Sequence, residues 1–368
     1  MASPPLLALA QSPPRCWSEL PLDLMQLIFE RLSFTDFERA KSVCSSWQTG
    51  SRQSKPNNKI PWMILLPEEK SYCLLFNPED REEKLYKTGD YFSNNIHCMA
   101  TCRSWLLMNP SYENWEHPVY IFNLLTRERI NLPLTTPVRR LHSAVLWIDD
   151  KTKDYLVIRE SLAYVKKGYN SWIQISDGIQ NQEDMVFKDH KLYCLTNNEL
   201  RIFDFSGEFP LQLSRASLGG GGRVNEIFSL RMRFPGVPWY VQQVRKKKNV
   251  VLTVRGDVLI VKSKNPAMSE TWNFKIFKMD SSSKGLEEIY SLGDEAIILD
   301  LGITVLAKDQ EGVISNSIYF TDEEIHWYGT EIFVFNLDTK KVEQLPPLVS
   351  SSASFSRARW FLPSFRND

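Results

Sequence analysis

The chain has no excess of charge of either sign and no long apolar run. Its 368 residues include 44 lysines and arginines and 44 aspartates and glutamates, so the formal net charge is zero at pH 7. A neutral chain has no global electrostatic attraction to nucleic acid or to an anionic membrane. No uninterrupted apolar stretch approaches the ~20 residues that a helix needs to cross a bilayer. We therefore expect no nucleic acid and no membrane among its partners.

Histidine and cysteine are scarce. The chain has five histidines and six cysteines, and several of the cysteines lie in apolar, strand-like runs. Reduced cysteine in such runs behaves as a small apolar residue, which indicates a reducing compartment, the cytoplasm and/or the nucleus. His97, Cys98 and Cys102 lie close together, but their spacing is unusual for zinc and no second Cys/His pair follows. The sequence therefore predicts no metal site and no cofactor.

Motifs that mark catalysis are missing as well. The sequence contains no Gly-x-Ser-x-Gly elbow and no His-Glu-x-x-His pair. The four glycines at 219–222 lack the Lys-Ser/Thr that would bind phosphates. Acidic pairs such as Asp149-Asp150 fall in predicted turns, where solvated side chains are expected. We therefore predict no catalytic residue and a non-enzymatic role.

The first 50 residues divide into a tail and a helical segment. Residues 1–14 hold four prolines and no basic residue before a short apolar run, which predicts a disordered tail and not a signal peptide. From 15 to 50, apolar residues recur at the helical steps of three and four. Pro21 suits the first turn of one helix, and Thr35 with Glu38 forms a capping box that begins a second.

The first of these helices is apolar on nearly every side. Its main stripe is widened almost all the way round, and its apolar residues are Leu20, Leu22, Leu24, Met25, Leu27, Ile28, Phe29 and Leu32. A unit of about 35 residues cannot bury so much apolar surface alone, because units below ~40 residues usually need a metal, a disulfide or a partner. Either the helices pack on the rest of the chain or they bind another protein.

Residues 15–50 resemble the F-box. The match consists of Leu20-Pro21-x-Asp23-Leu24, Ile28, Leu32, Asp36, Arg39 and Val43-Cys44-x-x-Trp47. The resemblance implies three helices that dock on a Skp-type adaptor, and through it on a cullin, in a Skp-cullin-F-box ubiquitin ligase. By position in the motif, the adaptor-binding residues are Leu20, Pro21, Ile28, Leu32, Val43, Cys44 and Trp47. Phe37 departs from the leucine of many members, and we expect the bulkier ring to be tolerated.

The remainder of the chain has the period of strands. Residues 51–60 are polar and contain Pro56, which predicts a linker before a domain at 61–368. Runs rich in β-branched and aromatic residues alternate with turn residues, and no long amphipathic helix intervenes. The predicted strands are 62–66, 71–76, 99–108, 119–123, 143–148, 155–158, 172–175, 185–187, 192–195, 200–205, 239–244, 250–254, 258–261, 274–278, 296–300, 317–320 and 332–336. The sequence predicts an α+β multidomain protein, a small trihelical unit followed by an all-β domain.

An internal repeat favours a β-propeller. Residues 119–133 and 332–346 share a strand, an Asn-Leu-x-Thr turn, a second strand and Leu-Pro. Four-strand units of ~40 to 50 residues form propeller blades, and about 300 residues accommodate six or seven of them. We predict that the C-terminal run 358–362 pairs with strands near Trp62 and closes the ring. A pair of β-sandwiches is the alternative.

An F-box followed by an aromatic-rich repetitive β domain is also similar to a plant F-box family whose C-terminal region is a kelch-like domain of unknown function. This similarity rests on the repeat and on Asn316-Ser-Ile-Tyr-Phe-Thr-Asp322, and it covers most of 60–350. It implies a substrate receptor and supplies no catalytic residues.

Surface residues of the β domain provide candidates for contact with a target protein. Most of the eleven tryptophans are expected in the core, because each buries a large area. Trp115 and Trp327 lie at loop ends, and we predict that they anchor a target, since aromatic residues are common at binding hot spots. The basic run Arg245–Lys248 is predicted to be the solvated tip of a hairpin.

Three functions fit the sequence. The first is the substrate-recognition subunit of a Skp-cullin-F-box ligase, with the β domain binding a target for ubiquitination. The second is a propeller enzyme or small-ligand binder that the helices cap, which a pocket of convergent polar residues near the central channel would favour. The third is an F-box protein that acts outside a cullin complex.

Overall fold

A computed structural model of the chain describes residues 17–29, 31–32, 37, 40–52, 54, 62–67, 70–76, 85–92, 96–110, 118–134, 144–159, 161–175, 182–218, 245–265, 272–280, 285–307, 313–322, 331–344 and 355–361. The chain divides into two compact units, one of Met1–Asn58 with Phe365–Asp368 and one of Lys59–Ser364. Within the described ranges, no helix is long and apolar enough to span a bilayer.

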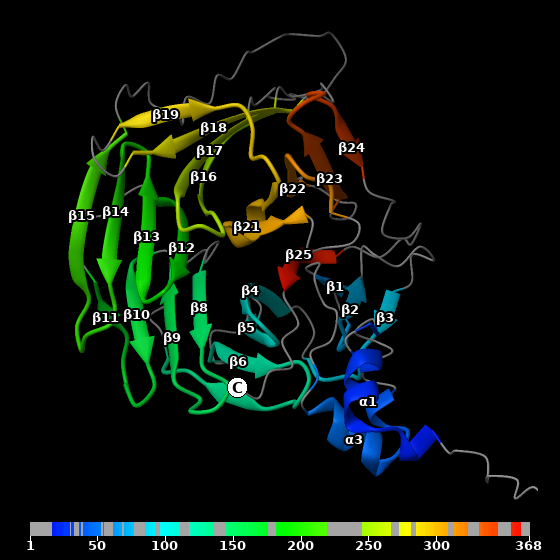
Figure 1. The fold of residues 1–368 in the computed structure, drawn as a ribbon. Helices are drawn as coiled ribbons and strands as arrows, with labels where there is room; N and C mark the ends of the chain where they lie inside the picture. The colour runs from blue at the N-terminus through cyan, green and yellow to red at the C-terminus, as the bar shows by residue number, and fades with distance from the viewer. Residues whose placement is uncertain are drawn as a thin grey trace, which may run out of the picture. The chain divides into compact units, whose positions relative to one another are not determined.

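The helical unit contains three short described elements. They are η1 (Trp17–Glu19), α1 (Leu22–Phe29) and α3 (Ser45–Ser51), which Figure 1 draws in blue. The predicted first helix is confirmed, and in its first turn the N–H of Met25 donates to the carbonyl of Pro21 at 3.0 Å. The predicted capping box lies outside the described residues. Ser51, the first residue of the predicted linker, is the last residue of α3.

The core of the helical unit is small and aromatic. Met25, Phe29, Phe37 and Ala40 are buried, and the rings of Phe29 and Phe37 meet edge to face with centroids 4.9 Å apart. Gly50 lets α3 approach α1 closely, because a Cβ at this position would lie 3.3 Å from the Met25 side chain. Partly buried residues packed against this core are Leu20, Leu32 and Trp47.

The second unit is built from strands joined by turns. Its strands are β1 (Trp62–Pro67), β2 (Leu74–Phe76), β3 (Leu85–Lys87), β4 (Ile96–Cys102), β5 (Trp105–Pro110), β6 (Tyr120–Asn123), β7 (Arg129–Asn131), β8 (Ala144–Ile148), β9 (Tyr155–Arg159), β10 (Ala163–Lys166), β11 (Ile173–Gln174), β12 (Gln182–Lys188), β13 (Lys191–Thr196), β14 (Glu199–Asp204), β15 (Leu211–Ser217), β16 (Arg245–Leu252), β17 (Val258–Asn265), β18 (Asn273–Met279), β19 (Leu286–Ile289), β20 (Glu295–Ile298), β21 (Ile303–Leu306), β22 (Ser317–Asp322), β23 (Glu331–Asn336), β24 (Val342–Gln344) and β25 (Phe355–Phe361). A 3-10 helix, η2 (Leu299–Leu301), joins β20 to β21.

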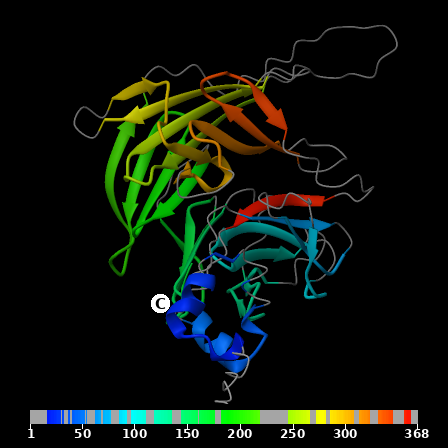
Figure 2. The same cartoon turned by 45° about the vertical axis from the view of Figure 1, so that its right-hand side comes forward.

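These strands form four four-stranded sheets and one nine-stranded sheet within the described part of the chain. The orders are β25-β1-β2-β3, β4-β5-β6-β7, β11-β10-β9-β8, β12-β13-β14-β15 and β19-β18-β17-β16-β21-β20-β22-β23-β24. Most pairs within these sheets are antiparallel, such as β12 with β13 and β13 with β14, whereas β16 with β21 and β20 with β22 are parallel. The all-β domain is confirmed, and its curled, mainly antiparallel sheets are consistent with the predicted β-propeller (Figure 2).

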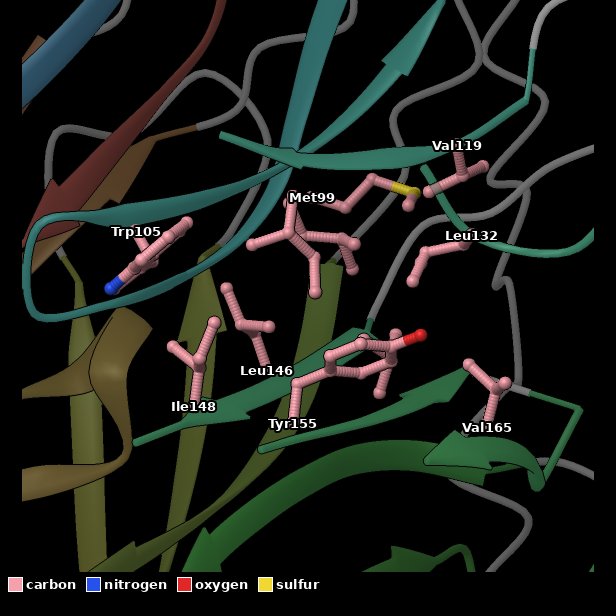
Figure 3. Close-up of a cluster of buried hydrophobic side chains, with 11 residues drawn as sticks. Met99, Trp105, Val119, Leu132, Leu146, Ile148, Tyr155 and Val165 are labelled. Atoms are coloured by element: carbon pink, nitrogen blue, oxygen red, sulfur yellow. The ribbon is translucent and has the colours of Figure 1, made fainter. Parts of the chain in front are cut away.

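Each sheet packs its apolar face on the next. Buried clusters join the β4–β7 and β8–β11 sheets, the β8–β11 and β12–β15 sheets, the β12–β15 sheet and β16–β17, the two halves of the nine-stranded sheet, and β20–β23 with β1, β2 and β25. Figure 3 shows the first cluster, with Trp105 and Val119 on one side and Ile148 and Tyr155 facing them. Since β25 also contacts β4, this succession of contacts closes on itself.

The C-terminal strand joins the first sheet. Trp62 of β1 lies opposite Phe361 of β25, and Met63 lies opposite Trp360. Figures 1 and 2 show β25, in red, beside β1, in blue. The predicted pairing of the C-terminal run with strands near Trp62 is confirmed, so hydrogen bonds between the first and last strands of this unit help to close it.

Two predictions about individual strands are wrong. The predicted single strand 99–108 is the β4–β5 hairpin, because Arg103, at φ 53°, adopts the left-handed conformation and reverses the chain. The basic run Arg245–Lys248 is not a hairpin tip but lies inside β16, paired with Lys262–Asn265 of β17. The ammonium of Lys248 donates to the carbonyl of Asn197, which offsets the cost of placing its charge in a buried strand.

Candidate functional site

Two sides of α1 have opposite environments. Met25 and Phe29, four residues apart, point into the core of the helical unit. Leu24 and Leu27, three residues apart, are 44% and 53% exposed. A helix that is apolar all round is normally buried on all sides, and here one side is not covered by the described residues of its own unit. The solvent-facing leucines of α1 therefore form a candidate contact surface.

Further apolar side chains of the same unit are exposed. Val43, just before α3, is 66% exposed, and Trp17 of η1 is 70% exposed. Single exposed apolar residues are ordinary, but several within one small unit are typical of a protein-binding surface. We refer to Leu24, Leu27 and Val43 as the exposed apolar set of the helical unit.

The seven predicted adaptor-binding residues fall into two environments. Pro21 and Val43 are exposed, and the half-buried ones are Leu20, Ile28, Leu32, Cys44 and Trp47. Three of these half-buried residues also pack on the core, so their side chains have a structural role whatever else they contact. Adaptor binding by the seven residues stays a prediction.

Trp47 shows this structural role most clearly. Its ring meets the ring of Phe29 edge to face at 5.5 Å, and its Nε1 donates to the carbonyl of Trp17 at 3.0 Å. The hydroxyl of Ser46 likewise donates to the carbonyl of Ser18 at 2.8 Å. Through these two hydrogen bonds α3 holds η1 in place. Leu20 and the exposed Pro21 connect η1 to α1.

Cys44 precedes α3 and is the N-cap residue without a side-chain capping bond. Its Sγ lies 3.1 Å from the Oγ of Ser46, and this contact is the main reason that the pKa of the Cys44 thiol is below its ordinary value. Cys98, for which the sequence predicted no metal-binding role, is different. Burial raises the pKa of its thiol to about 12, so the thiol is protonated at neutral pH. A protonated thiol is a poor metal ligand.

The two predicted target-binding residues, Trp115 and Trp327, lie outside the described residues. A surface that the sequence reading missed lies on β15, the last strand of its sheet. Leu211 and Leu213 of β15 are 66% and 48% exposed, and Phe209, two residues before the strand, is 65% exposed. Apolar residues at alternate positions are a visible sequence signal, but alternation alone does not tell which face of a strand is covered. An exposed apolar edge strand is suited to contact with another chain.

The chain matches two protein families, one in each unit. Residues 17–59 match the F-box domain family, and residues 71–336 match the KIB1-4 beta-propeller family. The F-box protein At1g69090 of Arabidopsis thaliana is 52% identical over 410 residues, which cover 100% of both chains. The putative F-box protein At5g66830 of the same plant is 50% identical over 373 residues, covering 96% of this chain and 94% of that protein.

A solved structure is also similar, at a much lower level. The N-terminal domain of Nup159 is 12% identical and has a TM-score of 0.37, with 79% of this chain and 75% of that chain covered.

Proposed function

Because the chain belongs to the plant F-box proteins that carry a KIB1-4 β-propeller, we propose that it is the substrate-recognition subunit of a Skp-cullin-F-box ubiquitin ligase. In this role the helical unit docks on a Skp-type adaptor and through it on a cullin, and the β unit binds a target protein. The observation that carries the proposal is the exposed apolar set, Leu24, Leu27 and Val43, on a unit whose own core is small.

The proposed mechanism is proximity. A receptor that holds a target near a ubiquitin-loaded enzyme raises the effective concentration of the target's lysines at that enzyme. This role needs no catalytic group on the receptor, and F-box and β-propeller domains are typically non-catalytic adaptors. We also propose that the β unit is kelch-like. It contacts the target through its loops or through the exposed edge of β15.

We propose a location in the cytoplasm and/or the nucleus. The five cysteines of the described residues, Cys44, Cys73, Cys98, Cys102 and Cys194, are all free. Free thiols in this number favour a reducing compartment over the secretory pathway.

The test is co-purification of the full chain with a Skp-type adaptor. We expect Leu27→Asp and Val43→Asp each to weaken capture at least tenfold, because a charge placed in an apolar interface removes a contact of about 2 kcal/mol or more. Both side chains are more than half exposed, so the helical unit should keep its fold. Trp47→Ala is a poor test, since it removes the Phe29 contact and the Trp17 hydrogen bond.

The matched control is Leu134→Asp, a leucine of the β unit that is 71% exposed. Its capture of the adaptor should equal that of the unsubstituted chain. If the unsubstituted, folded chain captures no adaptor, the ligase role is wrong. If it captures the adaptor but no cullin accompanies it, the function lies outside a cullin complex.

A further inference from the structure

Lysines lie directly opposite one another on three neighbouring strands of the nine-stranded sheet, β16, β17 and β18 (Figure 1). Lys248 of β16 is the register partner of Lys262 of β17, and Lys262 is in turn the partner of Lys275 of β18. Side chains at partner positions project from the same face of a sheet, with Cβ atoms about 5 Å apart. Like charges at such positions are destabilising, so a row of three lysines requires a physical explanation.

A fourth lysine extends this row along β17. Lys264 lies two residues after Lys262 and therefore on the same face, about 7 Å further along the strand. Its register partner on β16 is a further lysine, Lys246. We refer to Lys248, Lys262, Lys264 and Lys275 as the lysine patch.

The two ends of the row have partners within the β unit. The ammonium of Lys248, which is 5% exposed, donates to the carbonyl of Asn197 at 2.5 Å and lies 3.9 Å from the Glu183 carboxylate. The ammonium of Lys275 lies 3.3 Å from the Glu288 carboxylate. Lys248 is therefore a structural residue, and Lys275 has one acidic partner at the edge of the patch.

The middle of the patch is less well compensated. Lys262 is half-buried, and its ammonium lies over the ring of Phe277, 4.3 Å from the centroid. Lys264 is exposed. Among the described residues, neither ammonium lies within ion-pair distance of a carboxylate. These two lysines are the free cations of the patch.

Four ammonium groups of the patch thus share two carboxylates of the described residues. Burial raises the pKa of the Glu183 carboxyl, and the positive charges of Lys248 and Lys262 oppose this effect, so one carboxylate serves two lysines. Burial also lowers the pKa of the Lys248 ammonium, and the neighbouring charge of Lys262 lowers it further. The excess of positive charge is local, because the chain as a whole has a formal net charge of zero.

The arrangement of the free cations indicates the chemistry of a partner. Lys262 and Lys264 have the spacing at which alternate side chains of a second extended chain project, about 7 Å. An extended segment with acidic residues at alternate positions therefore places one carboxylate at each lysine. The described patch has no arginine, the residue favoured for bidentate phosphate recognition, and two free lysines are fewer than the roughly six or more phosphate contacts of a typical DNA-binding surface.

We propose that the lysine patch binds an extended acidic segment of the target protein, with carboxylates at alternate positions opposite Lys262 and Lys264. This assignment rests on the proposed function, because it names the chemistry of the target that the β unit holds. A bound carboxylate also relieves the repulsion between the lysines of the row. The free protein carries that repulsion, and its relief favours the complex.

The test is fluorescence anisotropy of the full chain with labelled octapeptides that alternate Glu with Thr, Gln with Thr, or Lys with Thr. We expect only the Glu-Thr peptide to bind. Its affinity should fall about fivefold or more between about 50 mM and about 300 mM NaCl, because salt screens contacts between exposed charges.

Substitution of both free lysines locates the site. Lys262→Gln/Lys264→Gln should weaken binding of the Glu-Thr peptide about tenfold or more, since both charge contacts are lost. The matched control, Lys151→Gln/Lys167→Gln, removes two exposed lysines of the β unit outside the patch and should leave binding unchanged. Lys262→Glu/Lys264→Glu should bind the Lys-Thr peptide and not the Glu-Thr peptide, which separates a contact between charges from a change of shape.

Three results would overturn the proposal. The first is that the Glu-Thr peptide does not bind, and the second is that both pairs of Gln substitutions weaken its binding equally. The third is that a labelled single-stranded DNA of twelve nucleotides binds more tightly and depends on Lys262 and Lys264, which makes the patch a nucleic-acid site. Adaptor capture is measured on the same samples and should not change in Lys262→Gln/Lys264→Gln, so failure of this patch and failure of the ligase role are distinguished.

Discussion

At the scale of single residues, Leu24 and Met25 illustrate how little a local pattern says about burial. They are adjacent and similarly apolar, yet Leu24 is 44% exposed and Met25 is 5% exposed. The helical period correctly predicts α1. The apolar stripe that it identifies, however, includes Leu24 and Leu27, which are exposed to solvent. The side that packs inward is decided by Phe37, Ala40 and Gly50, which are far along the chain and approach α1 only after folding.

The fold changes the charge of the Asp184 carboxyl near neutral pH. Burial raises the pKa of its carboxyl from 3.8 to about 6, against the opposing effects of Lys247 and of the bonds from Val250 and Asn249. A raised carboxyl pKa means that the folded state binds the proton more tightly than the unfolded state. The contribution to the free energy of unfolding is therefore full below about pH 4 and is lost as the pH rises towards 6.

We expect Asp184→Asn to remove this dependence. Relative to the unsubstituted chain, its free energy of unfolding should increase between pH 4 and pH 7 by at most about 3 kcal/mol and stay level above pH 7. The measurement is urea unfolding at several pH values, with the exposed Asp154→Asn as the control. A difference between Asp184→Asn and the unsubstituted chain that does not vary with pH would contradict the assignment.

At the scale of elements, the repeat read from the sequence corresponds to one recurring turn. The Oδ1 of Asn123 accepts from the N–H groups of Leu125 and Thr126 at 2.9 Å, and the Oδ1 of Asn336 accepts from those of Asp338 and Thr339 at the same distance. The fourth residue after each asparagine has positive φ, 64° at Arg127 and 55° at Lys340. The Asn-Leu-x-Thr pattern is therefore a turn with a physical cause.

The turn predicted at Asp149-Asp150 is confirmed, and it is a third copy of this turn, which the sequence reading did not link to the repeat because its first residue is aspartate. The Oδ1 of Asp149 accepts from the N–H groups of Lys151 and Thr152, and Lys153 has φ 55°. These bonds also lower the pKa of the Asp149 carboxyl, with the Thr152 N–H as the largest cause. The acidic pair at 149–150 is thus part of a turn.

We expect Asn336→Ala to destabilise the β unit by about 1 kcal/mol, because two backbone N–H groups lose their partner. Thermal or urea unfolding measures the loss. Lys341→Ala, an exposed residue in the same hairpin, is the matched control and should change stability by less than about 0.5 kcal/mol. Equal effects of the two substitutions would show that the asparagine side chain does not hold the turn.

The strands missed in the sequence are mostly those at the outer edges of sheets. β3, β15 and β19 each end a sheet, and the residues of β15 and β19 are largely exposed or half-buried. A strand with few buried residues needs no apolar run, which is the signal on which the sequence reading depends. Their partners in the sheet, not their own composition, make these segments strands.

At the scale of the whole β unit, β25 is the element that joins the end of the chain to its beginning. It supplies the buried Trp360 and Phe361 and pairs with β1 along the first sheet. It also contacts β4, and the Oγ1 of Thr101 donates to the carbonyl of Trp360 at 2.7 Å. Without this strand, the edge of β1 that pairs with β25 would be unpaired, and the ring of sheets would be open there.

We expect a chain that ends at Ser354, and so lacks β25, to lose cooperative unfolding of the β unit. Removal of a large buried aromatic costs about 3–5 kcal/mol, and the loss of two is comparable to the 5–15 kcal/mol by which a typical domain is stable. Circular dichroism on heating measures the transition. The matched control ends at Phe361 and retains β25. If both truncated chains melt within about 2 °C of the full chain, closure by β25 does not stabilise the unit.

The sequence by itself determined the helical segment, the change to strand period after it, the propeller architecture and the family, because these depend on local periods, turn residues and a motif of fixed spacing. Only the tertiary structure decided which side of α1 remains exposed, that Trp47 holds η1, and that Glu183, Asp184 and Arg359 line one cavity. The physical reason is distance along the chain. The last three residues come from β12 and β25, and only the closed succession of sheets brings these strands to one wall.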